Sequence, residues 1–364
     1  MNSATYISEI ILNNFRNYTS KKILFNRNFN VLVGDNGIGK TNILESISLF
    51  SNSRGLRNAT NEELTNTKRD CPFLPPDILY SLRIILSNGE KLSIIQREDK
   101  KIIKINDEII KKASVLNNFL NITFLIPQMD SFFTDSSSVR RKFLDKTAEI
   151  LFIEHYENVK KYDFFVKERM KILLEQGSDD KWLNIVEKKI TTLGVNIASV
   201  RNDTVAMINK ILTNSIKTFP IGNIEIVGEI EGLLNNKKST EVERYFLEQL
   251  QQNRESDAKD KRTSIGVHRS DVLVHNNEKN MRADLCSTGE QKMLLISLIL
   301  ARCIFSKQCG KGMPVLLLDE ICSHIDENTK IKLFDRLKDL SIQTFITGLK
   351  RDDFSYLTNE FIEL

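Results

Sequence analysis

The order of apolar and polar residues predicts strands, a turn and a helix near the start of the chain. Residues 31–33 (VLV) form the kind of short apolar run that is found in strands buried on both faces. Residues 42–50 place Ile43, Ile47 and Phe50 on one side of a helix. Residues 7–12 and 23–25 are expected to be strands that lead into this segment.

Between residues 78 and 110 the pattern becomes an alternation that is typical of strands. Turn residues interrupt it at 87–89 (SNG) and 98–100 (EDK). This segment is therefore expected to form an antiparallel β-meander that packs against the first elements.

Beyond residue 136 turn residues become rare, and two long helices are predicted, at about 138–175 and 180–219. In the second, apolar residues alternate at spacings of four and three with Thr204 at one polar position; they are Val186, Ile190, Leu193, Ile197, Val200, Met207 and Ile211. The two helices, joined by QGSDD, are expected to form an antiparallel hairpin, and residues 235–260 a polar helix and loop that return to the first part of the chain.

The composition restricts the possible classes of protein but does not indicate a function. With 364 residues, 41% hydrophobic and 27% charged, the chain fits a globular protein of two or three domains, or one domain with a large insertion. The net charge of +4 allows a nucleic-acid partner without requiring one. Five cysteines without a C-x-x-C pair favour reduced thiols and a cytoplasmic location, and the longest apolar run, 293–301, is too short to cross a membrane.

The turn after residues 31–33 has the spacing of a phosphate-binding loop, G-x-x-x-x-G-K-T. Its glycines let successive backbone N–H groups point into one concavity, and the following helix adds the positive end of its dipole. Lys40 is expected to reach the β and γ phosphates, and the Thr41 hydroxyl to bind Mg²⁺. A plain glycine-rich turn is the alternative. The expected nucleotide-binding residues are Gly34, Asp35, Asn36, Gly37, Ile38, Gly39, Lys40, Thr41 and Asn42.

A second part of such a site is predicted in PVLLLDEICSHID. The apolar run 315–318 reads as a buried strand that ends at Asp319, where a carboxylate could bind Mg²⁺, and Glu320 follows where it could hold the attacking water. The alternative is a buried strand that ends in an acidic turn. Because almost the whole chain separates Lys40 from Asp319, the nucleotide core must be split by the meander and the hairpin, which favours a head with an arm.

The segment CSTGEQKMLLISLILAR predicts a capped helix. Ser287 and Glu290 have capping-box spacing, so the N–H groups of Thr288 and Gly289 could form a second anion site. The alternative is simply a well-capped core helix. Since one chain already has a phosphate loop, the second anion site would best serve the γ phosphate held by a partner copy.

These motifs together resemble a known family. NFRNY, VLVGDNGIGKTNILESI, SSSVRRKFLD, GVHRSD, CSTGEQK and LLLDEICSHID are similar, in this order, to motifs of ABC-type ATPase heads of the SMC group, and more closely to those of the RecF family of bacterial DNA repair proteins. The resemblance implies an α/β fold, an ABC-type P-loop ATPase head with an antiparallel β subdomain and an inserted, mostly helical arm. Head segments at 1–135 and 262–364 and an arm at 136–261 are expected.

The resemblance also implies an activity and partners. These are ATP and Mg²⁺ as cofactors, a weak, DNA-stimulated ATPase that yields ADP and phosphate, and a homodimer that forms on ATP. The expected DNA partners are duplex DNA and junctions between single and double strands, and the expected protein partners are RecR and, indirectly, RecO and RecA.

Further residues receive roles only through this resemblance. Gln128 falls where a side chain senses Mg²⁺ and the γ phosphate, Asp326 in a loop that crosses the dimer, Thr347 at a switch position, and Arg16 near a nucleotide phosphate. The chain departs from the family pattern at Val267 and Ser270, where GPHRDD is expected, and at Asp319-Glu320, where an aspartate pair is common.

The residues that contact DNA are the least defined. Backbone phosphates could meet the basic residues Lys100, Lys101, Lys104, Lys111 and Lys112, or Arg140, Arg141 and Lys142, although a lysine-rich face is usually just solvated. Histidines 155, 268, 275 and 324 show no metal-binding spacing, so no nuclease centre is expected. A transporter ATPase subunit and another SMC-like ATPase that works with a nuclease are the alternative functions.

Overall fold

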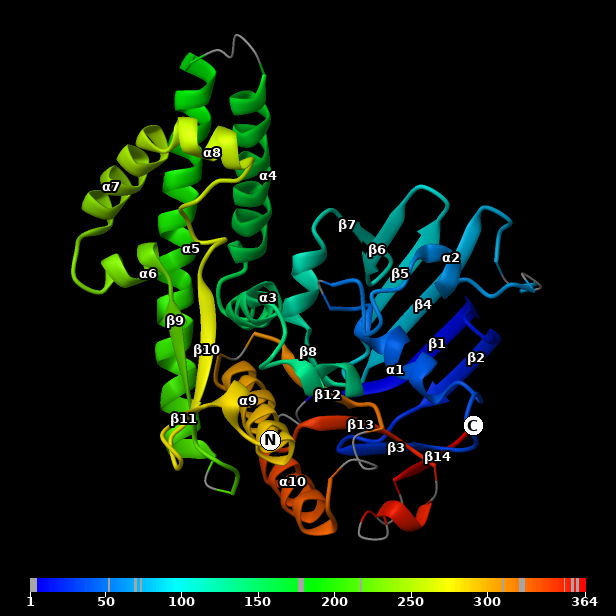
Figure 1. Ribbon diagram of the computed structural model, residues 1–364. Helices are drawn as coiled ribbons and strands as arrows, with labels where there is room; N and C mark the ends of the chain where they lie inside the picture. Colours follow the sequence, from blue (N-terminus) through cyan, green and yellow to red (C-terminus); the bar gives the residue numbers. More distant parts are fainter. Residues whose placement is uncertain are drawn as a thin grey trace. The chain divides into compact units, whose positions relative to one another are not determined.

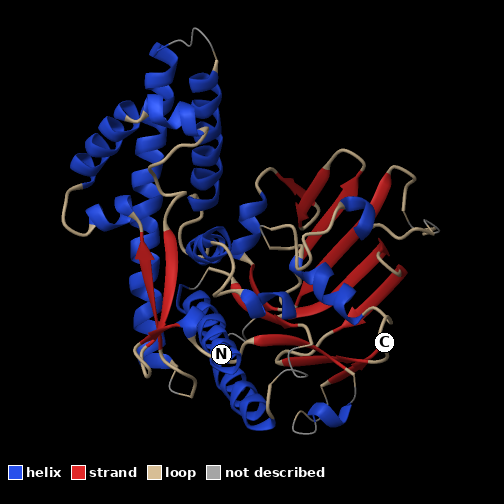
Figure 2. Cartoon of the chain, in the orientation of Figure 1, coloured by secondary structure: helices blue, strands red, loops and turns tan. Residues whose placement is uncertain are grey.

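The computed structural model describes residues 5–51, 53–68, 71–72, 74–175, 180–216, 218–309, 311–320, 325–349, 351–354, 357 and 360–364. The chain divides into two compact units (Figure 1): the first unit is Met1–Met129 with Ser306–Leu364, and the second unit is Asp130–Phe305. Strands dominate the first unit and helices the second (Figure 2).

The first unit contains an antiparallel sheet with strand order β2-β1-β4-β5-β6-β7. Its strands are β1 (Ile7–Phe15), β2 (Tyr18–Leu24), β4 (Ile78–Leu86), β5 (Lys91–Arg97), β6 (Lys101–Ile105) and β7 (Glu108–Ile110). Gly89, with φ of 90°, forms the turn after β4 as its lack of a side chain allows. The predicted meander is confirmed, and β1 and β2 run further than the predicted strands.

A parallel sheet, with order β14-β3-β13-β12-β8, forms the other half of the first unit. Its strands are β3 (Phe29–Val33), β8 (Leu120–Leu125), β12 (Met313–Leu318), β13 (Gln343–Gly348) and β14 (Phe361–Glu363). Every residue of β3 is buried, including the polar Asn30, which explains the apolar run at 31–33. Because all five strands run the same way, the carboxyl ends of β3, β12 and β13 meet at one edge.

Helix α1 (Lys40–Ser48) lies in the core that the two sheets share. Ile43 and Ile47 pack there with Leu82 of the antiparallel sheet and Leu317 of the parallel sheet. The other face of the parallel sheet is covered by α10 (Glu327–Leu340), whose Phe334 ring lies 5.8 Å from that of Phe29. The short helices α2 (Asn61–Leu64), η1 (Ala113–Asn118) and η5 (Arg351–Phe354) complete this unit, and η2 (Pro127–Ser131) begins in it and ends in the second unit.

The second unit is mostly helical. Its elements are α3 (Ser137–Ala148), α4 (His155–Leu174), α5 (Asp180–Ser215), β9 (Gly222–Val227), α6 (Glu229–Leu234), α7 (Ser239–Gln252), α8 (Arg254–Asp260), β10 (Asp271–Asn276), β11 (Met281–Arg282), η3 (Ala283–Leu285) and the first part of α9 (Thr288–Cys309). The antiparallel sheet β11-β10-β9 was not predicted from the sequence.

Helices α4 and α5 form the predicted antiparallel hairpin. Asn158 bonds to Asn196, and Arg169, further along α4, bonds to Glu187, which comes earlier in α5. The prediction of one helix over 138–175 is wrong, because α3 ends at Ala148 and α4 begins at His155. Ten residues of straight helix span about 15 Å, so the break is what allows His155 Nε2 to lie 2.8 Å from Asp145 Oδ1.

The expected arm, 136–261, lies wholly in the second unit, and so does 262–305, which the sequence assigned to the head. The two units are defined only by which residues pack together, so the division into head and arm stays a prediction. Within the described residues, no helix combines the length and apolar character that membrane crossing requires. Among the described residues, Cys71, Cys286, Cys303 and Cys309 form no disulfide, and Cys322 and His324 lie outside the described residues.

Candidate nucleotide-binding site

The turn between β3 and α1 has the backbone of a phosphate-binding loop. Gly34, Gly37 and Gly39 have φ of 149°, 85° and 117°, in the region that favours glycine. At Gly39 the requirement is also steric, since an added Cβ would collide with the Tyr18 hydroxyl and the Asn17 amide. These glycines therefore serve the loop geometry that the sequence predicted.

Lys40, the first residue of α1, folds back across this loop. Its Nζ donates hydrogen bonds to the carbonyl oxygens of Gly34, at 2.5 Å, and Asp35, at 2.9 Å, and the side chain is buried. No acidic residue stands in the first turn of α1, so the positive end of the helix dipole is not neutralised there. A buried ammonium and a helix amino end at one glycine-rich loop provide what a phosphate group needs.

Residues of the NFRNY motif support the loop from the β1–β2 turn. Asn17 Nδ2 donates to the carbonyl of Ile38 at 2.9 Å, and Asn42, in α1, donates to Asn17 Oδ1 at 2.8 Å. The Tyr18 hydroxyl also points to the Ile38 carbonyl, at 3.5 Å, and burial raises the pKa of Tyr18 to about 12, so the hydroxyl keeps its proton. Sequence reasoning took only Arg16 from this motif and missed the support by Asn17 and Tyr18.

Arg16 itself binds a carboxylate. Its guanidinium makes two hydrogen bonds of 2.7 Å to Glu45, which is buried in α1, and its backbone has φ of 52°. A paired, bidentate arginine fixes the β1–β2 turn against α1. The expected contact between Arg16 and a nucleotide phosphate stays a prediction.

Asp319 brings the strand edge and the phosphate loop together. Its Oδ1 accepts hydrogen bonds of 2.9 Å from the hydroxyls of Thr41 and Thr347, and its backbone N–H donates to Leu125 O at 3.1 Å. The three side chains come from α1 and from the carboxyl ends of β12 and β13, which are neighbours in the sheet. The structure thus gathers three residues that lie far apart in the sequence.

The donor set at this point fits Mg²⁺. A threonine hydroxyl and a carboxylate meet beside the phosphate loop, and Mg²⁺ commonly takes one or two such protein oxygens while phosphates and waters complete its shell. In the part of the chain that the structure describes, no group of three or more His, Cys, Asp and Glu residues could bind a metal. Thr41 and Asp319 are therefore the residues that would hold the ion.

Glu320 has a strained backbone at the position predicted to hold the attacking water. Its φ is 52°, which costs a residue with a side chain about 1–3 kcal/mol, and its N–H donates to Thr347 Oγ1 at 2.9 Å. Its side chain is exposed. Thr347 therefore joins both acidic residues through one hydroxyl, a role more specific than the switch position that the resemblance implies.

Two other expected residues lie at or near this edge of the first unit. Gln128 is exposed in η2, shortly after β8, the parallel neighbour of β12. Asp326 caps α10, since its carboxylate accepts from the backbone N–H of Thr329 at 3.0 Å and from its hydroxyl at 2.6 Å. Their expected contacts with nucleotide or a partner copy stay predictions.

The expected second anion site lies in the second unit. Helix α9 begins at Thr288, and the Ser287 backbone N–H donates to Glu290 Oε2 at 3.0 Å, which is one half of the predicted capping box. Lys279 also pairs with Glu290, and this bond, with that from Ser287, lowers the pKa of the Glu290 carboxyl. A Cβ added at Gly289 would meet open space, so the helix start is accessible.

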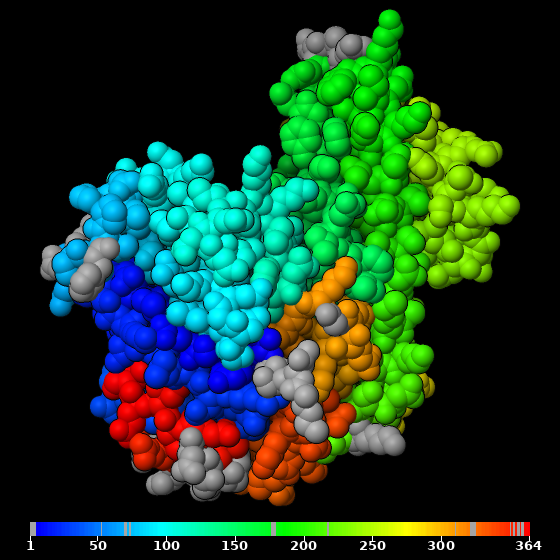
Figure 3. Space-filling model, turned by 180° about the vertical axis from the view of Figure 1, so that it is seen from behind, coloured from blue at the N-terminus to red at the C-terminus, as the bar shows by residue number. Residues whose placement is uncertain are grey.

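The proposed DNA contacts fall into two groups. Lys100, Lys111 and Lys112 are exposed on and after the meander, whose surface Figure 3 shows in cyan, and Lys104 is half-buried. Lys101 is already engaged, because its Nζ donates to the Leu49 carbonyl at 3.5 Å and burial lowers the pKa of its ammonium. The assignment of Arg140 as a phosphate contact is wrong, because this buried guanidinium is bound by both carboxylate oxygens of Asp271, at 2.9 and 2.8 Å.

Arg141 is also occupied, since it donates to the Ser270 carbonyl and, at 2.8 Å, to the Ser137 hydroxyl. The motifs SSSVRRKFLD and GVHRSD therefore pack against each other inside the second unit. Ser270, a departure from the family pattern, gives its hydroxyl to Glu231 at 2.8 and 2.7 Å.

Comparison with known proteins agrees with this arrangement. The model of the RecF/RecN/SMC N-terminal domain family matches residues 6–363. The DNA replication and repair protein RecF of Rickettsia conorii is 36% identical over 343 residues, 94% of each chain. That of Rhizobium johnstonii is 34% identical over 353 residues, 96% of this chain and 94% of its own.

Solved structures agree in fold. The recombination mediator protein RecF-ATPrS in the RecFOR pathway has a TM-score of 0.84 at 24% identity, over 96% of this chain and 94% of its own. The corresponding RecF-ATP structure has a TM-score of 0.82 at 23% identity, over the same shares.

A phosphate loop between β3 and a helix, an acidic residue at the end of β12, which β13 separates from β3, and a split parallel sheet define a P-loop ATPase head of the SMC type. The sequence match to relatives over nearly the whole chain identifies the family within this class of ATPase heads. The chain belongs to the RecF family of DNA replication and repair proteins.

Proposed function

We propose that the chain binds ATP and Mg²⁺ between the phosphate loop and Asp319, and hydrolyses ATP slowly to ADP and phosphate. The observation that supports this proposal is that the hydroxyls of Thr41 and Thr347 both donate hydrogen bonds to the Asp319 carboxylate, beside a buried lysine. ATP also stands in the names of two solved structures with the same fold.

Each residue has a defined part in this proposal. Lys40 exchanges its bonds to Gly34 and Asp35 for bonds to the β and γ phosphates, while Thr41 and Asp319 hold Mg²⁺. When bound, Mg²⁺ supplies positive charge that stabilises the developing charge on the phosphates. Glu320 orients the attacking water, with its backbone fixed by Thr347, and Gln128 senses the metal and the γ phosphate.

We further propose that two copies share each triphosphate. The accessible start of α9 supports this, because Ser287 and the N–H of Gly289 from a second copy could bind the γ phosphate that the first copy holds. Asp326, in the loop after the magnesium strand, would lie in the same interface. Loss of the γ phosphate removes what the partner copy binds, so hydrolysis opens the dimer.

The family supports a role in DNA replication and repair, and we propose that this role is recombinational repair in the cytoplasm. We propose that the ATP-bound dimer closes on duplex DNA and on junctions between single and double strands, that DNA stimulates hydrolysis, and that the protein acts with RecR, and indirectly RecO, to place RecA on single-stranded gaps. The exposed lysines Lys100, Lys111 and Lys112, together with Lys142 of α3, are candidates for contacts with DNA phosphates.

Light scattering with and without ATP-Mg²⁺ and gapped duplex DNA tests the shared site. The wild-type chain should double its mass on ATP, Lys40→Arg should stay monomeric, and Glu320→Gln should remain a DNA-retaining dimer that hydrolyses ATP at least about tenfold more slowly. A monomer in every condition would overturn the shared site. Unchanged hydrolysis in Glu320→Gln would instead refute only the role of Glu320.

A further inference from the structure

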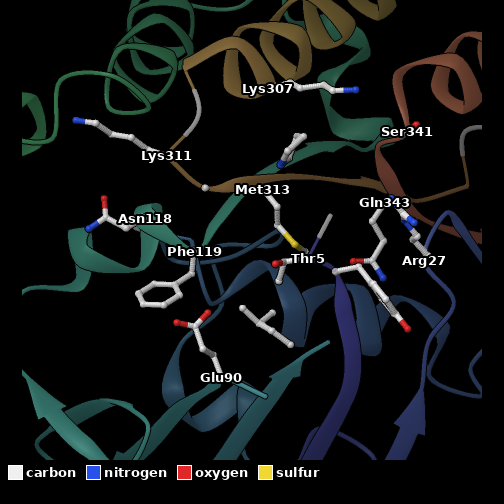
Figure 4. A pocket seen from close by; sticks show the side chains of 14 residues that line it. Thr5, Arg27, Glu90, Asn118, Phe119, Lys307, Lys311, Met313, Ser341 and Gln343 are labelled. Carbon is white, nitrogen blue, oxygen red and sulfur yellow. The ribbon is translucent and has the colours of Figure 1, made fainter. Parts of the chain in front are cut away.

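A cavity of about 450 Å³ opens in the first unit where the parallel strands begin (Figure 4). Met313 is the first residue of β12, Gln343 the first of β13, and Phe119 directly precedes β8. The phosphate loop and Asp319 follow the carboxyl ends of the same strands. The cavity therefore lies at the opposite edge of the sheet from the nucleotide-binding residues, and the proposed ATPase does not use it.

The lining combines an apolar centre with a basic rim. The apolar side chains that line it are those of Tyr6, Leu86, Phe119, Met313 and Pro314. The charged residues around it are Arg27, Lys307 and Lys311, against a single carboxylate, Glu90. Such a lining favours a ligand that has both an apolar group and negative charge.

One of the three cations has a structural task. Lys307 Nζ donates to the carbonyl of Leu340 at 2.6 Å, where α10 ends, and so offsets the negative end of that helix. Arg27 and Lys311 are exposed, and neither forms an ion pair with any carboxylate in the described ranges of the chain. Their charge is thus available to a ligand.

The position of the charges indicates separate anionic groups rather than one phosphate. Phosphate sites often use the amino ends of helices, whereas the helix ends at this cavity are carboxyl ends, those of α9 at Cys309 and α10 at Leu340. In Figure 4 the side chains of Lys307 and Lys311 point away from each other, so they do not surround one point. Carboxylates spaced along an extended chain would reach both sides of the rim.

We propose that this cavity docks an acidic peptide segment of a partner protein. One apolar side chain of the segment enters the centre beside Phe119 and Met313, and flanking aspartate or glutamate carboxylates pair with Arg27 and Lys311. Charge complementarity at the rim and an apolar anchor at the centre provide orientation and affinity together.

Fluorescence anisotropy with three labelled probes, in the absence of ATP, tests this docking site. The first is a pool of octapeptides that alternate aspartate or glutamate with leucine, methionine or phenylalanine, the second has lysine at the acidic positions, and the third is octathymidine. Only the first should bind. The double variant Arg27→Glu/Lys311→Glu should weaken binding about tenfold or more, because each reversal turns an attraction into a repulsion. Both residues are exposed, so the variant should fold.

The matched control is Lys332→Glu/Lys210→Glu, which makes the same change of charge at exposed sites outside the cavity. It should bind the acidic pool within about twofold of the wild type, because distant exposed charges are screened. Amide exchange should slow at 117–119, 311–313 and 341–343 when the pool binds. The proposal is overturned if the acidic pool fails to bind, if both variants lose binding equally, or if octathymidine binds more tightly and loses that binding in the cavity variant.

Discussion

The Thr347 hydroxyl offers a sharp test of the candidate site, because it joins both acidic residues. It donates to Asp319 Oδ1 and accepts from the Glu320 N–H, each at 2.9 Å, and Thr347 is almost fully buried. Thr347→Val keeps the shape of the side chain and removes only these two bonds. The change leaves a backbone N–H without its acceptor at a residue whose φ, 52°, is already strained.

The magnitude follows from the two bonds. A hydrogen bond to a charged group contributes about 1.5–3 kcal/mol, and one to a neutral backbone group about 1 kcal/mol. Their sum is about 3 kcal/mol, shared between stability and the placement of Asp319 and Glu320. If half of this free energy stabilises the transition state for hydrolysis, its loss lowers the rate about tenfold. If all of it does, the rate drops somewhat more than a hundredfold.

The assay is ATP hydrolysis at saturating ATP-Mg²⁺ with duplex DNA, together with urea denaturation of the same samples. Thr344→Val is the matched control, since Thr344 is also buried on β13 but bonds to the carbonyl of Ile342 and not to an acidic residue. Thr347→Val should slow hydrolysis ten- to a hundredfold and Thr344→Val less than about threefold. Full activity in Thr347→Val would refute the idea that this hydroxyl positions Asp319 and Glu320, and equal losses would assign the effect to the strand.

Two further predictions concern the loop and the second unit. Gly39→Ala should abolish binding of a fluorescent ATP analogue while leaving far-UV circular dichroism unchanged, because alanine at φ of 117° is strained and its Cβ meets the Tyr18 hydroxyl; retained binding would show that the loop adapts. Burial lowers the pKa of His268 to about 4 from its ordinary 6.5, so the unfolded chain takes up a proton first and stability is lost as the pH falls from 6.5 to 4. Urea midpoints measured across this range should fall less in His268→Gln than in the wild type, and parallel curves would contradict the assignment.

The sequence predicted those parts of the fold and of the site that depend on patterns of neighbouring residues. Glycine spacing predicted the phosphate loop, alternation predicted the meander, and an apolar run that ends in Asp319 predicted the strand edge, because each of these patterns acts within about ten residues. Arg140 shows where this reasoning ends. Its neighbours in sequence make it look like part of a basic cluster, yet Asp271, far along the chain, makes it a buried structural residue. A pairing of that kind leaves no local pattern.

Helix α5 shows the same limit within one element. The apolar stripe predicted for it included Val200 and Met207, but Met207 is 40% exposed, and the neighbouring positions Arg201 and Ile208 are buried instead. A stripe chosen by apolar residues alone passed over Arg201, since an arginine is almost never fully buried unless it is paired. Whether Arg201 lies on the buried face of α5 depends on the residues of other segments that pair with it.

The partners of Arg201 come from other segments of the second unit. Arg201 binds both oxygens of Asp145, at 2.8 and 2.9 Å, and the Val267 carbonyl at 2.7 Å. Burial alone would raise the pKa of Asp145, but Arg201 and His155 outweigh it and lower the value to about 2, so the carboxylate stays charged and the pair intact at neutral pH. Asp145 belongs to SSSVRRKFLD and Val267 to GVHRSD, so one arginine between them in the sequence joins both motifs in the structure. These contacts give both motifs a structural role in the packing of the second unit.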